Sequence, residues 1–167
     1  MRREALEKLP IYKKANEIYD ICMKFTDLII DEHHASDKIE LQMLVETARH
    51  IRENAMIIPV KISGAEAVEL YDIKMENAAI IRKCAREIRT NTFSFGMLEH
   101  LELDYIKLIR NEIEEFRILF AEWVKTFDQW NYIIDRWGLF NPPGIEYDDH
   151  DPDDDLPFNP DDFFEDL

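Results

Sequence analysis

Metal ligands are the first chemical groups to look for in this chain, because helical proteins rich in carboxylates often hold two iron ions. Such a site needs Glu-x-x-His on each of two helices, so that both ligands point inward. None of the five histidines has a glutamate three residues before it. Glu46 and His50 are four apart and could chelate from one helix, but no second pair accompanies them. His33 and His34 fall in an expected loop, so the sequence predicts no metal site.

Nucleophilic and phosphate chemistry lack their usual motifs as well. None of the three serines lies in Gly-x-Ser-x-Gly, and the four scattered glycines form no phosphate-binding loop. Cys22 and Cys84 have no histidine beside them and lie on apolar helical stripes. That placement is typical of small buried hydrophobes in a reducing compartment. We therefore predict no catalytic residue, no cofactor and no enzyme activity.

A basic stripe is the first feature that suggests binding. It consists of residues at four- and three-residue spacing with one lysine beside them: Arg82, Lys83, Arg86 and Arg89. One interpretation is a solvated helix face whose cations pair with Glu76 and Glu87. The other is an anion-binding surface for RNA, for a partner protein, or for the acidic tail of this or a neighbouring chain.

Aromatic residues are concentrated toward the C-terminus and are the second candidate. A helix that outruns its bundle cannot bury so many rings, so we expect a subunit contact or a platform covered by the tail. The tail either is a solvated appendage or docks on protein through its spaced aromatic residues. The candidate contacts are Trp123, Phe127, Trp130, Trp137, Phe158, Phe163 and Phe164.

The formal net charge of −16 is unevenly distributed. Residues 146–167 contain 11 acidic residues and no Lys or Arg, which leaves 25 acids against 20 bases, or −5, in the first 145 residues. This balance disfavours a nonspecific nucleic-acid binder, because affinity for phosphates comes from clustered cations. The sequence shows no secretory signal and no apolar run long enough to span a bilayer, so we expect a cytoplasmic protein without membrane contact.

The first two helices are predicted from apolar residues at alternating steps of three and four. We expect the first to begin at Pro10 and the second to follow Ser36, a plausible N-cap. Pro59 should kink or break the second helix, because it lacks an N–H and crowds the carbonyl of residue 55. The two stripes are Ile11, Ala15, Ile18, Cys22, Phe25 and Ile29, and then Leu41, Leu44, Ala48, Ile51, Ala55, Ile58 and Ile62.

For the last two helices the sequence leaves alternatives open. Ser63 and Glu66 have the spacing of a capping box, which places the start of the third helix near Ala65 and its end near Arg89. The alternative continues the second helix to residue 70 and caps the third with Asp72. Helical periodicity from 101 to 137 predicts a long fourth helix that either bends near residues 126–128 or projects past the bundle.

Two segments resemble a known family. Residues 9–15, Leu-Pro-Ile-Tyr-Lys-Lys-Ala, resemble the opening signature of the four helix bundle family. This family includes proteins encoded in intervening sequences of bacterial ribosomal RNA genes and the accessory variability determinants of diversity-generating retroelements. Residues 58–65 resemble its Ile-Pro-x-Asn-Ile-Ala-Glu-Gly segment, although Lys61 replaces Asn and Ser63-Gly64-Ala65 replaces Ala-Glu-Gly. The likeness covers roughly residues 9–125, including the third helix.

The resemblance implies an antiparallel four-helix bundle without enzyme activity, often a homopentamer. For retroelement members it also implies an accessory that binds a reverse transcriptase and nucleic acid through a basic surface. We predict an all-α, antiparallel up-down four-helix bundle over residues 1–140, with a long C-terminal helix, followed by a Pro-containing acidic tail over 141–167.

Three functions are compatible with these features. The first is a non-catalytic, oligomeric scaffold or adaptor, with a pentamer as the first expectation. The second is an accessory that binds nucleic acid or a reverse transcriptase through the stripe on the third helix. The third is a tail that acts as an acidic decoy for the basic site of a partner.

Overall fold

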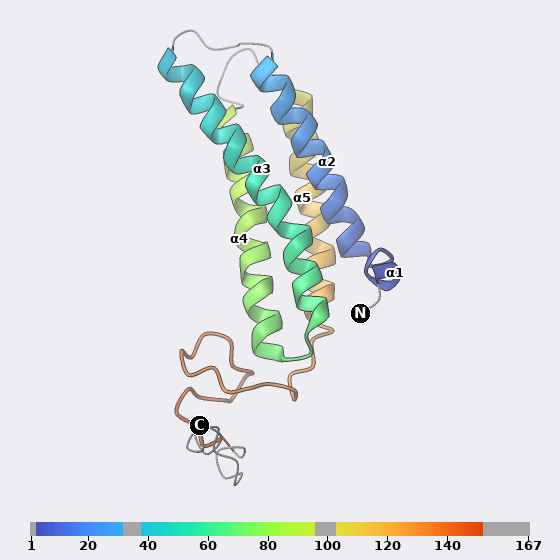
Figure 1. Cartoon of the computed structure of the whole chain (residues 1–167), viewed down its shortest axis with the longest axis vertical. Helices are drawn as coiled ribbons and strands as arrows, with labels where there is room; N and C mark the ends of the chain where they lie inside the picture. The colour runs from blue at the N-terminus through green and yellow to red at the C-terminus, as the bar shows by residue number, and fades with distance from the viewer. Residues whose placement is uncertain (1–2, 32–37, 96–102, 152–167) are drawn as a thin grey trace, which may run out of the picture.

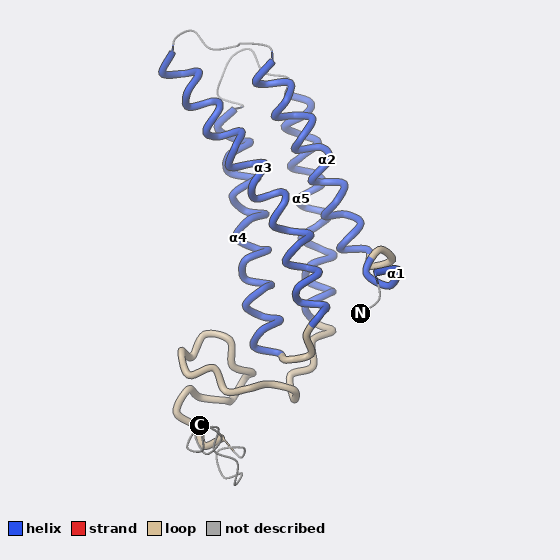
Figure 2. Tube along the Cα trace, in the orientation of Figure 1, coloured by secondary structure: helices blue, strands red, loops and turns tan. Residues whose placement is uncertain are grey.

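The computed structural model describes residues 3–31, 38–95 and 103–151 of the 167-residue chain. Within these ranges it contains helices and no strand (Figure 2). α1 is a single turn, and the four longer helices of the described ranges lie side by side along one axis (Figure 1). The helices are α1 (Arg3–Leu6), α2 (Pro10–Asp31), α3 (Lys38–Ala67), α4 (Tyr71–Phe95) and α5 (Leu103–Val124).

The four long helices pack in a closed ring. Successive helices are antiparallel neighbours, and α5 returns to pack against α2. In the view of Figure 1, α2 and α3 lie nearer the viewer and α4 and α5 lie behind them. The predicted fold class, an all-α antiparallel four-helix bundle, is therefore confirmed.

The predicted stripes of the first two helices form one part of the core, and buried residues of α4 and α5 complete it. All six residues of the α2 stripe are buried, and so are those of the α3 stripe except Leu41, which is 38% exposed. Each fully buried Ile contributes roughly 1.5–3 kcal/mol relative to an exposed one. Cys22 and Cys84 are buried free thiols, as predicted, and burial raises the pKa of Cys22 to about 12.

The break expected in α3 does not occur, because the helix continues through Pro59 and Ser63 to Ala67. The predicted start of the third helix near Ala65 is wrong, and the alternative boundary is closer, since α4 begins at Tyr71. The physical reason is that Ile58, Ile62 and Ala65 are all fully buried, so continuing the apolar stripe outweighs one lost backbone hydrogen bond.

The end of the third helix expected near Arg89 also falls inside a helix, because α4 continues to Phe95. Thr92 is buried, and its hydroxyl donates to the Ile88 carbonyl at 2.8 Å. Phe95 packs edge-on against Phe25 of α2, with ring centroids 5.6 Å apart. The N-cap expected at Ser36 lies outside the described residues.

The fourth long helix is shorter than predicted, since α5 ends at Val124 instead of near residue 137. The Thr126 N–H and hydroxyl both bond to the Trp123 carbonyl, at 3.0 and 2.7 Å. These contacts close the helix with a tight last turn and leave its final carbonyls satisfied. The periodic aromatic residues that follow belong instead to an irregular stretch, residues 125–151, which we call the basal segment.

The basal segment lies across the end of the bundle where α3 passes into α4 (Figure 1). The Tyr71 N–H donates to the Asn131 carbonyl at 2.7 Å, and the Ile133 N–H donates to the Asp72 carboxylate at 3.2 Å. Further along, Asn141 exchanges two hydrogen bonds with the backbone of Asp135, at 2.6 and 2.9 Å. The segment is thus attached to the bundle by specific polar contacts.

Candidate functional site

A groove between α4 and α5 brings together most of the features that could bind a ligand. Three adjoining hollows share Arg89, and the one with an apolar floor has a volume of about 350 Å³. We call this surface the α4–α5 groove. Its apolar floor is formed by Ala85, Ile113, Phe116, Phe120, Ala121 and Val124. Its basic rim is formed by Arg82, Arg86, Arg89, Lys107, Arg110 and Arg117.

The three predicted arginines of α4 all line this groove, but the lysine beside them does not. Lys83 lies 3.7 Å from Glu87, and Glu87 also accepts a hydrogen bond from the Asn54 side chain of α3 at 3.0 Å. Lys83 therefore belongs to the α3 side of α4. The described part of the chain shows no ion pair at 4 Å or less for Arg82 or Arg86, so the pairing of these arginines with Glu76 and Glu87 is not observed.

The charge of the groove is strongly positive. Six basic side chains face one acid, Glu114, among the described lining residues. Arg117 donates to the Glu114 carboxylate at 2.6 and 2.9 Å. These hydrogen bonds lower the pKa of Glu114, and the nearby charge of Arg89 adds to the effect. Glu114 is thus held ionised but neutralises only part of the rim, which leaves the groove suited to an anionic ligand.

At the end of the groove that lies farther from the basal segment, the exposed ring of Phe93 extends the binding surface. Phe93 is 56% exposed, and the Arg110 guanidinium lies 5.9 Å from its ring centroid. Sequence reasoning missed this ring and the α5 half of the rim. A signal was present, because Lys107, Arg110 and Arg117 repeat on one helix face at steps of three and seven. It was not recognised because the pairing of that face with α4 depends on the tertiary fold.

The predicted aromatic contacts divide into two groups. Trp123 and Phe127 are buried within the protomer and pack edge-on at 4.8 Å, and the Trp123 indole donates to Glu66 at 2.7 Å. Trp130 and Trp137 are 91% and 89% exposed. Phe158, Phe163 and Phe164 lie outside the described residues. Only the two exposed tryptophans are therefore free for an external contact among the described members of this set.

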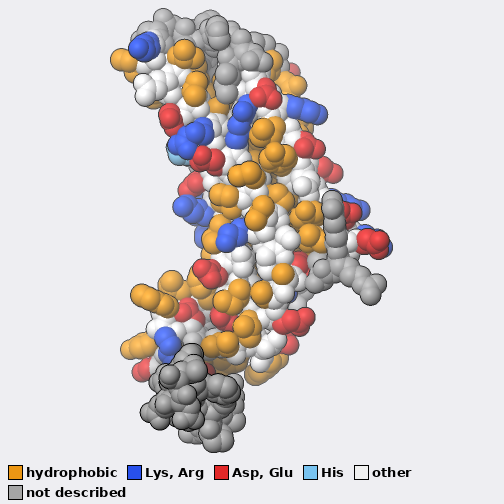
Figure 3. Space-filling view, viewed as in Figure 1, with side chains coloured by type: hydrophobic (Ala, Val, Ile, Leu, Met, Phe, Trp, Pro, Cys, Tyr) orange, Lys and Arg blue, Asp and Glu red, His pale blue; other side chains and the backbone are white. Residues whose placement is uncertain are grey.

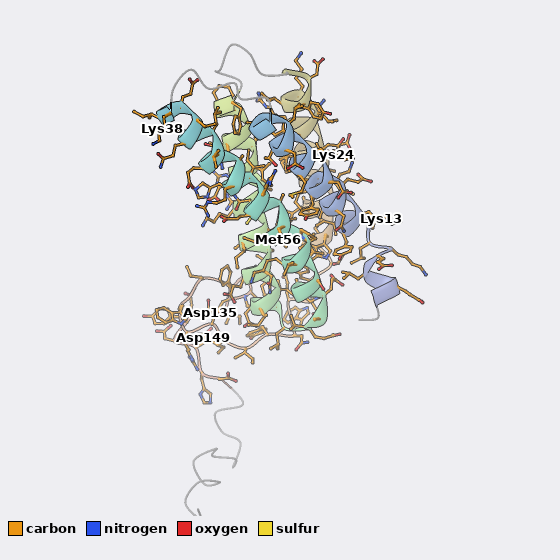
Figure 4. The ribbon with its side chains drawn as sticks, turned by 45° about the horizontal axis from the view of Figure 1, so that its top comes forward. Lys13, Lys24, Lys38, Met56, Asp135 and Asp149 are labelled. Carbon is orange, nitrogen blue, oxygen red and sulfur yellow. The ribbon has the colours of Figure 1, made fainter. Side chains whose placement is uncertain are left out.

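The exposed tryptophans both lie in the basal segment, at the end of the bundle. Ile133 and Leu139 of the basal segment are also exposed, and we call these four residues the basal patch. Asp135, labelled in Figure 4, holds part of this surface in place, because its carboxylate accepts hydrogen bonds from the backbone N–H groups of Trp137, Leu139 and Phe140. These bonds lower the pKa of Asp135.

The opposite side of the bundle, between α2 and α3, carries a hollow of different character. Its lining is uncharged and consists of Tyr12, Asn16, Tyr19, Met56, Pro59, Val60 and Ser63. Figure 3 shows apolar side chains gathered in a band along the middle of this face. An anion therefore has no cationic partner in this hollow, and the two faces of the bundle differ in the ligands that they favour.

The remaining sequence features show no constellation for metal binding. His50 lies 3.8 Å from Glu53, and both side chains are about half exposed. In the described ranges, no group of three or more His, Cys, Asp or Glu is placed to hold a metal ion. The described helices also include none that is both long enough and apolar enough to cross a membrane.

Comparison with known proteins adds no relative to this description. No family model, no curated protein and no solved structure matches the chain.

Proposed function

We propose that this protein is a non-catalytic, oligomeric adaptor that binds a segment of a partner protein in the α4–α5 groove. The segment carries acidic residues and an apolar side chain that packs on the floor of the groove. The observation that carries the proposal is the combination of an apolar floor with arginines that lack an acidic partner in the described structure. Arg82 and Arg86 are exposed beside the buried Phe116. A ligand that supplies both carboxylates and an apolar side chain satisfies the rim and the floor together.

The shape of the groove supports a peptide ligand. From Arg82 to Phe93 the groove follows 11 residues of α4, which corresponds to roughly 16 Å at 1.5 Å per residue. This length accommodates about five residues of an extended peptide. Phe120 and Val124 are only partly buried, so an apolar anchor placed on them removes further apolar surface from water.

Nucleic acid is the second candidate ligand, and one observation favours it. Phe93 is an exposed ring surrounded by Arg86, Arg89 and Arg110, an arrangement in which a single-stranded base could stack while the cations contact phosphates. This role would agree with the accessory function implied by the resemblance of residues 9–125 to the four helix bundle family. The overall charge of −16 opposes it, since the field of the whole protein repels a polyanion.

The oligomeric part of the proposal rests on the basal patch. Two tryptophans that are about nine-tenths exposed, beside exposed Ile133 and Leu139, form an apolar surface of the kind that a second subunit covers. We assign a second copy of this chain as the occupant, with a pentamer as the first expectation.

The adaptor function is tested with two labelled probes added to the full chain. One is a peptide of about a dozen residues in which glutamates flank two leucines, and the other is oligouridine of about the same length. Fluorescence anisotropy is measured at low salt and again at raised salt. We expect the peptide to bind, and we expect salt to weaken binding only in part, because the apolar floor contributes independently of ionic strength.

A charge-matched pair of variants identifies the site. Arg86→Glu combined with Arg110→Glu should reduce peptide binding at least about tenfold, because both rim cations become repulsive. Lys13→Glu combined with Lys24→Glu makes the same change in net charge on α2, away from the groove (Figure 4), and should leave binding unchanged. Binding of oligouridine alone, lost in the groove variant, would replace the peptide with nucleic acid. Binding of neither probe would overturn the proposed function.

A further inference from the structure

The C-terminal segment of this chain has the composition that the α4–α5 groove favours. Residues 152–167 carry seven acidic residues and no Lys or Arg. They also carry apolar side chains, among which Phe163 and Phe164 are flanked by two acids on each side. These are the two chemical properties, a ring pair and surrounding carboxylates, that match the floor and the rim of the groove.

The described chain ends close enough for this segment to reach the groove. Asp149 lies near the end of the basal segment and is held against its middle, because the Arg136 guanidinium donates to the Asp149 carbonyl at 2.8 Å. Figure 4 shows Asp149 beside Asp135, near the start of α4. The basal segment meets α4 at Asp72, from which Arg82 is about 15 Å and Arg89 about 26 Å along the helix axis. Twelve residues from 151 to 163 span up to roughly 40 Å when extended.

The direction of the groove also suits an occupant that enters from the base. Its lower end is lined by Val124, the last residue of α5, directly before the basal segment. Its upper end is lined by Phe93 and Lys107. A chain that enters from this end therefore meets the apolar floor first, beside Phe120 and Ala121.

We propose that the C-terminal segment of this chain occupies its own α4–α5 groove and competes there with the segment of a partner protein. Phe163 and Phe164 lie on the floor, and Asp161, Asp162, Glu165 and Asp166 face the arginines. The inference rests on the proposed function, because it gives the regulation of the same site. A partner binds only when its segment displaces the tail. The apparent affinity of the partner for the groove is therefore lower than it would be without the tail.

The loss of affinity for a competing peptide follows from the effective concentration of the tethered tail at the groove. A short flexible tether gives about 1 mM, so a tail with an intrinsic Kd of about 100 µM would weaken the binding of a competitor roughly tenfold. The first experiment measures the anisotropy of the glutamate–leucine peptide with the full chain and with the full-length Phe163→Ala, Phe164→Ala variant. We expect the variant to bind the peptide about tenfold more tightly.

The second experiment locates the tail directly. A photoreactive benzoylphenylalanine replaces Phe163 in the full chain, and mass spectrometry identifies the residues that it attaches to after illumination. We expect attachment to α4 or α5 within the groove, and loss of attachment in the Arg86→Glu, Arg110→Glu background but not in the Lys13→Glu, Lys24→Glu background. Mixing isotopically light and heavy chains should give no mixed products, since the contact is within one chain.

The possible results distinguish failure of this inference from failure of the proposed adaptor function. Equal peptide affinity for the chain and its Phe163→Ala, Phe164→Ala variant, or attachment outside the groove, would overturn the inference and leave the adaptor function standing. Products that join light and heavy chains would assign the contact to a neighbouring chain and overturn occupation within one chain. If the peptide binds neither protein, both the inference and the proposed function fail.

Discussion

Trp123 connects two helices that end at the same side of the bundle. Its indole N–H donates to Glu66 of α3 at 2.7 Å, and its ring packs edge-on against Phe127. A buried indole needs such an acceptor, because an unpaired polar group inside the protein costs about 1–3 kcal/mol. The residue therefore fixes the end of α5 against α3, and the effect of removing it depends on ring and hydrogen bond separately.

Substitution of Trp123 separates these two contributions. Trp123→Phe keeps a ring but loses the donor, and we expect a loss of about 1–2 kcal/mol in the free energy of unfolding. Trp123→Ala also leaves a cavity, and we expect about 3–5 kcal/mol. Trp137→Ala is the control, because that side chain is 89% exposed and should change stability by less than about 0.5 kcal/mol. Urea denaturation followed by circular dichroism measures all three. Equal losses for Trp123→Ala and Trp137→Ala would contradict the assigned packing.

Asp135 makes part of the basal patch sensitive to pH. Its carboxylate accepts three backbone hydrogen bonds, from Trp137, Leu139 and Phe140, each at 2.9 Å. The bond from Trp137 contributes most to lowering its pKa below the ordinary value of 3.8. A group whose pKa is lowered on folding stabilises the fold above its unfolded pKa, and this contribution is lost as pH falls through the folded value.

We therefore expect the loop from 135 to 140 to keep its structure at neutral pH and to lose it in acid. The amide protons of Trp137, Leu139 and Phe140 should shift together in NMR spectra as pH falls below about 3.8. Asp135→Asn should give similar shifts already at neutral pH, because the amide accepts fewer and weaker hydrogen bonds. Asp148→Asn is the matched control, and it should leave these three amides unchanged. If the three amides titrate independently of one another, the shared carboxylate is not their acceptor.

α3 shows that a helix continues through residues that usually end helices when its apolar face remains buried. Gly64 lies inside α3, and a Cβ placed on it would meet the nearest atom, Asn77 Oδ1, at 3.5 Å, an ordinary contact distance. Gly64→Ala should therefore stabilise the protein by about 0.5–1 kcal/mol, the usual difference between the two residues in a helix interior. Gly138 is the contrasting case, because its φ of 71° is left-handed. Gly138→Ala should cost about 1–2 kcal/mol. Thermal unfolding by calorimetry measures both, and a destabilised Gly64→Ala would show that the helix needs the glycine there.

Periodicity predicted the fold class and the cores of the first two helices, because a narrow apolar stripe can be buried in only one way. The preferred prediction ended α3 too early, since Ser63 and Glu66 have the spacing of a capping box while Glu66 instead accepts a hydrogen bond from Trp123. The alternative, which continued the helix to residue 70, came closer to its end at Ala67. The end of α5 was missed for a related reason. The apolar period continues past Val124, but Asn131 and Ile133 bond to the start of α4, a contact that only the assembled bundle provides.

Only the α4 side of the candidate groove could be predicted from the sequence. Arg82, Arg86 and Arg89 repeat on one face of a helix, and that pattern was compatible with either a solvated face or an anion-binding surface. Most of the floor comes from α5, where Ile113 and Phe116 are buried and Phe120 and Val124 are only partly buried. No feature of the sequence shows that Phe120 and Val124 stay partly exposed, because their exposure depends on how closely α4 and α5 approach.

The whole molecule places its distinct surfaces on different sides. The α4–α5 groove is basic, the α2–α3 hollow is uncharged, and the basal patch is apolar. Ligand binding and self-association are therefore expected to use separate faces. This separation allows an oligomer to present several grooves at once, which raises the avidity for a partner that carries repeated acidic segments.

The basal patch provides the test of assembly at the scale of the whole molecule. A protomer of 19.9 kDa should appear in light scattering as a particle of several times that mass, five times for a pentamer. Trp130→Ser with Trp137→Ser should shift the mass toward the protomer, because burial of these side chains is lost from the interface. Met56→Ser with Val60→Ser makes a comparable change on the exposed α2–α3 face and should leave the mass unchanged. A wild-type chain with the mass of one protomer at about 100 µM, a concentration at which specific subunit contacts persist, would remove the oligomer and leave the groove as the basis of the adaptor.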